Sequence, residues 1–245
     1  MTRDVRPSDA APSPSGAGSP VSDAARGIGE TPGDAALPLT NRGRRTRDRL
    51  IEAAEVVFTR DGYLDAKIAD IASTAGVANG SFYTYFESKE AIFRTVIQVV
   101  LDEMYVAATV PDEVEHEPHA RIEHATRAYM QAYREHAGLI GILEQVATFN
   151  PGFREMRRGI RQAFRARTEK GLRRLQREGL IDQDLAPKCT AEALGSMVSN
   201  FCYVSFVLGE TYPEEEAVRT VTSLWMRGIG LGPRVGKPAA VTTGS

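Results

Sequence analysis

Helical periodicity, broken at intervals by glycine and proline, is the feature that most constrains how this chain folds. One face of the first helical run is formed by Leu50, Ala53, Ala54, Val57 and Phe58. These apolar residues recur three or four positions apart, which is the spacing of a buried helix face. Similar runs follow, separated by Gly138, Asn150-Pro151-Gly152, Gly179, Pro187 and Pro213. Because no alternating strand pattern competes with these runs, the sequence predicts an all-α fold.

The breaks divide the chain into two groups of helices. The first three are predicted from about Arg45 to Asp61, from Lys67 to Thr74 and from Ala78 to Tyr85. A longer helix opens at Glu87-Ser88-Lys89-Glu90, and others are predicted over roughly 118–136, 138–148, 152–179, 187–209 and 213–230. We therefore expect a small three-helix domain at 44–91 and a larger helical domain at 92–232, with about nine helices.

The two ends of the chain differ from this helical part in composition. Residues 1–43 are rich in Ala, Pro, Ser and Gly and carry almost no large apolar side chain, so burial cannot offset the entropy of ordering them. A disordered, basic and proline-rich arm is expected there, and a flexible tail at 233–245. No stretch resembles a signal peptide or a membrane span of ~20 apolar residues. We therefore expect a cytoplasmic, nucleoid-associated protein without membrane contact.

Positive charge is concentrated just before the first helical run. The formal net charge is −2, yet Asp48 is the only acid within a cluster of five arginines. The cluster consists of Arg42, Arg44, Arg45, Arg47 and Arg49. Such a patch suits phosphates or a DNA minor groove, although it can equally be a solvated helix face. Arg45 is the candidate contact from this cluster.

A second pattern lies between Lys67 and Phe86, where the sequence is KIADIASTAGVANGSFYTYF, followed by ESKEAIF. Two predicted helices flank a corner at Gly76. Glycine adopts the positive φ that a tight corner requires, and Val77 is placed to fill the space between the helices. The pattern is typical of a helix-turn-helix at 67–86, whose second helix enters the major groove of DNA.

The same segment resembles the DNA-binding domain of the TetR family of repressors. The matching positions are Ile71-Ala72, Ala75-Gly76-Val77, Gly80-Ser81-Phe82-Tyr83, Tyr85-Phe86 and Ser88-Lys89-Glu90. The resemblance implies a homodimer that binds an inverted-repeat operator in double-stranded DNA and responds to a small-molecule effector. One departure is Ala66-Lys67, where the family commonly has Ser or Thr, so Asp65 is expected to cap the second helix instead.

The candidate DNA contacts each have a physical reason. Gly80 has no side chain and allows close approach to the sugar-phosphate backbone, while nearby hydroxyl and amide groups can reach phosphates or base edges. Lysines at helix starts add positive charge beside natural anion sites. The expected contacts are Arg45, Lys67, Asn79, Gly80, Ser81, Tyr83, Thr84, Tyr85 and Lys89. Tyr83 and Tyr85 have packing in the core as an alternative, and Phe82 and Phe86 are expected to be core residues.

The larger domain is implied by the resemblance to bind the effector and to dimerise. Flexible and aromatic side chains that could surround an apolar or amphipathic ligand, such as a lipid or an acyl thioester, are Met130, Tyr133, Phe149, Met156, Phe164, Met197, Phe201, Tyr203 and Phe206. Small and apolar residues of the last two helices suit a four-helix interface between subunits, and the candidates are Gly195, Ser199, Leu224 and Trp225. Ordinary intramolecular packing is the alternative for both sets.

No catalytic, metal or cofactor motif accompanies these features. Cys189 and Cys202 lack the paired spacing of a zinc or redox site and are expected to be buried thiols. The four histidines form no helical pair with metal-ligand spacing. The sequence thus favours a ligand-responsive transcriptional repressor that is not an enzyme and needs no cofactor. The alternatives are a helical small-molecule carrier with a vestigial DNA-binding domain, and a non-specific DNA-binding protein.

Overall fold

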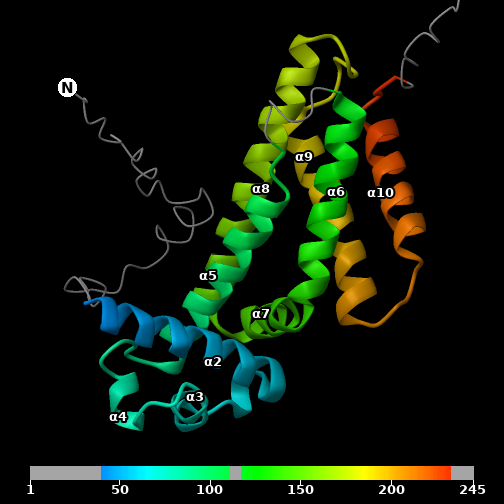
Figure 1. The fold of residues 1–245 in the computed structure, drawn as a ribbon. Coiled ribbons are helices and arrows are strands. Elements are labelled where there is room, and N and C mark those ends of the chain that lie inside the picture. Colours follow the sequence, from blue (N-terminus) through cyan, green and yellow to red (C-terminus); the bar gives the residue numbers. More distant parts are fainter. Residues whose placement is uncertain (1–39, 111–116, 233–245) are drawn as a thin grey trace, which may run out of the picture.

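The computed structural model describes residues 40–110 and 117–232 of the chain. The regular secondary structure of these residues is helical. Three helices lie together at one end (Figure 1), namely α2 (Asn41–Asp65), α3 (Ile68–Thr74) and α4 (Asn79–Phe82). We call these three helices, with the first turns of the next one, the head. The remaining helices form the body, and they are α5 (Lys89–Ala107), α6 (Pro118–Glu135), α7 (Ala137–Phe149), α8 (Pro151–Arg177), α9 (Pro187–Cys202), η1 (Tyr203–Val207) and α10 (Glu214–Gly228). The predicted all-α fold is confirmed over these residues. None of their helices combines the length and the apolar character that a membrane span requires.

Helix α2 begins at Asn41, earlier than the predicted start near Arg45. The cause is Thr40, whose side-chain oxygen accepts a hydrogen bond from the Gly43 amide at 3.1 Å and so caps the helix. The arginine cluster therefore lies on the first turns of a helix and not in an arm before it. At the predicted stop the helix is interrupted by Gly62, which has a φ of +74°, and a short helical stretch then continues to Asp65. The predicted arm and tail lie almost wholly outside the described residues.

The second and third helices of the head meet at the predicted corner. Gly76 has a φ of +65°, and Val77 packs against the core beside it. The expected cap from Asp65 is wrong, because α3 starts after an extended Lys67 without any side-chain capping bond. Asp65 is instead the last residue of α2.

Helix α4 is a single turn, shorter than the predicted helix from Ala78 to Tyr85. After Phe82 the backbone continues in tight turns, in which the amides of Tyr85 and Phe86 both donate to the Phe82 carbonyl at 2.9 and 3.0 Å. Tyr83, Thr84 and Tyr85 therefore lie in the segment that follows the helix.

The body helices begin where capping residues stand. Asn150 accepts hydrogen bonds from the amides of Gly152 and Phe153, and Pro151 occupies the first turn, so α8 starts there. The predicted helix over 187–209 is split, because α9 changes to a π-helix after Cys202. There the Leu208 amide donates to the Tyr203 carbonyl at 3.1 Å, five residues earlier.

Head and body share an aromatic cluster at their junction. Phe93 of α5 is fully buried, with its ring 4.8 Å from Phe58 of α2 and 5.2 Å from Phe153 of α8. Helix α7 lies across the junction between the head and the long helices (Figure 1). At its start His136 lies 3.3 Å from a carboxylate oxygen of Glu103 on α5 and 4.0 Å from one of Glu55 on α2. Because α5 belongs to both regions, it couples their positions.

Candidate nucleic-acid interface and ligand cavity

The exposed surface of the head around α4 is anchored from within by two phenylalanines. Phe82 and Phe86 are buried, as expected, and fix the backbone on which their neighbours are displayed. Tyr83 points outward with 57% of its surface exposed, and Thr84 is exposed beside it. Tyr85 is half-buried and packs against the core. Hydroxyl groups are thus presented to solvent from a rigid support.

Gly80 lies in this surface, and nothing inside the molecule requires it to be glycine. A Cβ atom added there would have no neighbour within 4 Å, and its φ is not positive. Asn79 before it is also exposed, whereas Ser81 after it is half-buried. The missing side chain leaves the backbone open to close approach from outside.

A groove runs between the start of α2 and α4. Its lining comes from α2, the corner after α3 and the α4 segment, and consists of Arg42, Arg45, Thr46, Arg49, Gly76, Val77, Ala78, Ser81, Thr84 and Tyr85. The α2 members are spaced three or four positions apart and so share one helix face. Arg45 was the contact chosen from the arginine cluster, and Arg42 was not chosen with it. The signal that places Arg42 on the same helix face is Thr40, which caps α2 and starts it early.

Two other arginines of the cluster contribute to the fold. Arg49 donates from its guanidinium to the Ala75 carbonyl at the end of α3, and Arg47 stacks 5.2 Å above the Phe86 ring. Arg42 and Arg45 are exposed and line the groove, where they can reach an anion.

The two lysines expected to contact DNA differ in their surroundings. Lys67 is exposed at the start of α3. The ammonium of Lys89 donates to the carbonyls of Leu64 and Ala66, both at 2.9 Å, and lies 5.0 Å from the Tyr63 ring centre. Burial lowers the pKa of Lys89. Lys89 thus holds the end of α2 against α5, a role that sequence analysis did not predict.

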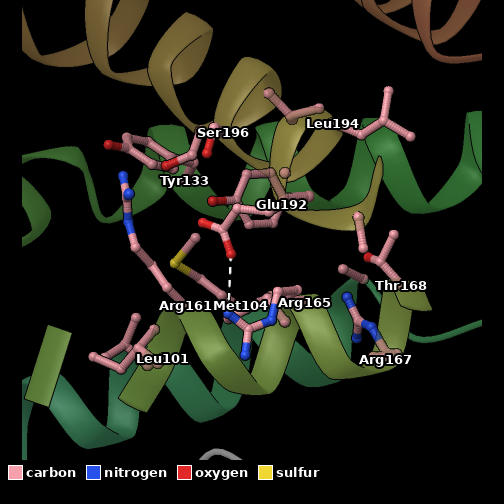
Figure 2. A pocket seen from close by; sticks show the side chains of 18 of the residues that line it. Leu101, Met104, Tyr133, Arg161, Arg165, Arg167, Thr168, Glu192, Leu194 and Ser196 are labelled. Atoms are coloured by element: carbon pink, nitrogen blue, oxygen red, sulfur yellow. Dashed lines mark hydrogen bonds and ion pairs between the residues drawn. The ribbon is translucent and has the colours of Figure 1, made fainter. Parts of the chain in front are cut away.

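The body contains a partly open cavity of about 160 Å3. Two of the nine predicted wall residues, Tyr133 and Phe164, line it, and Tyr133 is labelled in Figure 2. The lining also includes apolar residues that were not predicted to be cavity wall. Among them are Leu101, Met104, Ala108, Ala125, Tyr129, Ile140, Leu143, Ile160, Ala191, Leu194 and Val198. Burial raises the pKa of both Tyr129 and Tyr133, so their hydroxyls stay neutral.

The other predicted wall residues lie elsewhere. A second cavity of about 270 Å3 is lined by Met130, Phe201 and Phe206, together with residues of α6, α10 and the loop before α10. Outside both cavities are Phe149, which is 55% exposed, Met156, which is fully buried, and Met197 and Tyr203, which pack against the core. The type of side chain was predictable, whereas its orientation depends on how the helices pack.

The four candidate dimer residues are divided between two locations. Gly195, Ser199 and Trp225 line the first cavity, and Leu224 is 53% exposed on α10. Helix α10 packs mainly on α6, where Arg134 and Glu214 form an ion pair at 2.6 Å. Near its end, Trp225 also joins an apolar cluster with α9.

The cysteines differ from each other, and the expectation that both are buried is wrong for one of them. Cys189 is exposed near the start of α9, and Cys202 is buried at its end. Burial raises the pKa of Cys202 to about 12. Over residues 40–110 and 117–232, no three His, Cys, Asp or Glu side chains gather as possible metal ligands.

Comparison with known proteins agrees with the geometry of the head. A family model described as bacterial regulatory proteins of the tetR family matches residues 50–96. The transcriptional regulator TcmR of Streptomyces glaucescens is 30% identical over 172 residues, which cover 66% of this chain and 74% of that protein. The transcriptional repressor DhaR of a Mycobacterium species is 28% identical over 60% of this chain and 76% of its own length. Matches of 35–44% identity cover less than a third of those relatives.

Solved structures resemble the whole described fold. A transcriptional regulator from Saccharomonospora viridis in complex with choline superposes with a TM-score of 0.67 over 78% of this chain and 100% of that chain, at 16% identity. At that identity the likeness shows the shared fold alone.

Proposed function

This chain belongs to the TetR family of bacterial regulatory proteins, and on that premise we propose that it is a sequence-specific repressor released from its operator by a small ligand. The observation that carries the proposal is the α4 surface. There the exposed Tyr83, Thr84 and Gly80 adjoin a groove lined by Arg42 and Arg45. Arginines supply affinity for phosphates, while the α4 segment offers groups that distinguish base edges.

Duplication of the head explains how one short helix turn selects a site. A homodimer places two α4 segments in successive major grooves about 34 to 36 Å apart, and the operator is then an inverted repeat. Gly80 serves this docking, because a side chain there would separate the backbone of α4 from the DNA strand. Lys67, Asn79, Ser81 and Tyr85 are secondary contacts in this arrangement.

Helix α5 is the element through which a ligand would act. Its Leu101 and Met104 line the body cavity, while its Ile92 and Phe93 are fully buried in the shared core at the junction with the head. A ligand that shifts α5 therefore changes the position of the head. To convert a population from 1:99 to 99:1, the ligand must favour the DNA-incompetent state by about 5.5 kcal/mol.

The test compares a duplex from the chain's own upstream region with a scrambled duplex of equal length. We expect a gel shift on the upstream duplex at concentrations that leave the scrambled duplex free. Tyr83→Ala should abolish the preference, and Tyr212→Ala is the matched control, since that tyrosine is 51% exposed on the body. Equal retardation of both duplexes would favour a non-specific DNA-binding protein, and no retardation would favour a carrier.

A further inference from the structure

The lining of the body cavity carries more positive than negative charge. Its charged residues are four arginines of α8 and two glutamates, namely Arg157, Arg161, Arg165, Arg167, Glu144 and Glu192. Each glutamate is already paired. Glu144 lies 2.5 Å from Arg157, and Glu192 lies 3.1 Å from Arg165, the contact drawn as a dashed line in Figure 2. Two arginines therefore remain without a carboxylate from the cavity wall.

The two remaining arginines differ in their contacts. Arg167 donates to the Tyr105 carbonyl at 2.7 Å and to the Thr109 hydroxyl at 2.8 Å, and its guanidinium lies over the rings of Tyr105 and Phe164. Arg161 forms no ion pair with any residue in the described ranges. Its side chain extends from α8 toward Tyr133 at the exposed edge of the cavity (Figure 2).

Three buried polar atoms of the lining also lack a partner among the described residues. They are the hydroxyl of Thr126, the Nε–H of Arg165 and the indole N–H of Trp225. Thr126 is only 3% exposed. Two of these groups can only donate a hydrogen bond, and the hydroxyl can donate or accept. A ligand that satisfies all three must therefore offer hydrogen-bond acceptors, and carboxylate oxygens are strong ones.

The rest of the wall is apolar and limits the size of the ligand. Leu101, Met104, Ile140, Leu143 and Ile160 contribute aliphatic surface from three helices. A cavity of about 160 Å3 is close to the ~150 Å3 that holds a benzene-sized molecule. The enclosed part of the ligand is therefore about six carbon atoms in size.

We infer that the effector of this protein is an amphipathic organic anion, with a carboxylate or similar acceptor group at the polar part of the lining, to which Arg161, Arg165 and Trp225 contribute, and a short apolar part among the aliphatic residues. The inference rests on the proposed ligand-responsive function and specifies its ligand class. The choline complex of the structural relative holds a quaternary ammonium cation. A cation is disfavoured here, because Arg167 already occupies the cation–π position on Phe164 and both glutamates are neutralised.

The test is calorimetric titration of the full chain, without DNA, by three probes of equal chain length: hexanoate, hexanol and hexyltrimethylammonium. We expect hexanoate to bind about tenfold more tightly than the other two, because only its oxygens accept charge-assisted hydrogen bonds. Arg161→Gln should weaken hexanoate about fivefold, as expected for a partly exposed ion pair, and leave hexanol unchanged. Trp225→Phe should likewise reduce the preference for hexanoate over hexanol.

Arg158→Gln is the matched control, because Arg158 is an exposed arginine of α8 that pairs with Glu155 and does not line the cavity. The inference is overturned if hexanol or the ammonium binds as tightly as hexanoate, if both arginine variants weaken hexanoate equally, or if none of the probes binds. Because no DNA is present, these results are separate from the gel shift. Hexanoate binding by a chain that ignores its upstream duplex would refute the proposed repressor and leave the ligand class standing.

Discussion

The head and the body present their polar groups in opposite ways. In the head buried apolar residues, Phe82 and Phe86 among them, support polar side chains that point outward. In the body the polar atoms of Thr126 and Trp225 point inward and find no partner among the described residues. The contrast shows why one surface suits a large, charged and rigid partner and the other a small molecule. Each region can therefore be tested separately, the head by its affinity for DNA and the body by its affinity for a small molecule.

The largest expected effect tests whether the two regions are a single folding unit. Phe93→Ala removes a fully buried ring that contacts both α2 and α8, and we expect a loss of about 3–5 kcal/mol in the free energy of unfolding. Urea unfolding should remain one transition, seen together by circular dichroism and by fluorescence of Trp225, the chain's one tryptophan. Phe149→Ala, at an exposed site, should change stability by less than about 0.5 kcal/mol. Two separate transitions would contradict the coupling of head and body through α5.

The next effect is confined to the body and depends on pH. Burial raises the pKa of Cys202 from 9.0 to about 12, so the folded state keeps its thiol neutral where the unfolded state ionises. This contribution to stability is fully present below pH 9.0 and is lost as the pH rises toward about 12. The loss is roughly 1 kcal/mol per pH unit, and Tyr129 and Tyr133 act in the same direction. Cys202→Ala should flatten the fall in unfolding free energy; an unchanged slope would contradict the buried thiol.

The third effect is confined to the head and separates binding from stability. Gly80→Ala places a methyl group where the molecule itself leaves open space, so folding should be unaffected or stabilised by about 0.5–1 kcal/mol. DNA affinity should fall about tenfold or more, because the backbone of α4 can no longer approach the duplex. Fluorescence anisotropy with a labelled upstream duplex measures the affinity, and thermal unfolding measures the stability. An alanine variant that binds as well as the wild type would remove Gly80 from the interface.

The same contrast explains what the sequence could predict. The features of the head are local: a corner at Gly76, apolar spacing around Phe82 and a short separation between helices. Two details of the head were harder to predict. One is the early start of α2 after Thr40. The other is the hydrogen bonding of Lys89 to the carbonyls of Leu64 and Ala66, which lie 25 and 23 residues earlier in the chain.

The body cavity was less predictable because six helices contribute to it. A small rotation of any one of them decides whether a side chain faces inward. Tyr129 and Tyr133 lie one turn apart on α6 and both line the cavity, whereas Phe149, also aromatic, is exposed at the end of α7. Residue type alone does not distinguish these cases. The charge of the lining was likewise not predictable, because the ion pair between Arg165 and Glu192 forms only when α8 and α9 pack side by side.

The role of the α4 surface is tested most directly by selecting duplexes from a random-sequence pool with the full-length protein and sequencing those that bind. We expect enrichment of one inverted repeat whose half-site centres lie about 10 base pairs, or a multiple of that, apart. Tyr83→Ala and Gly80→Ala should lose that enrichment. Recovery of unrelated sequences by the wild type, or of the same repeat by both variants, would contradict the claim that the α4 surface selects the DNA site.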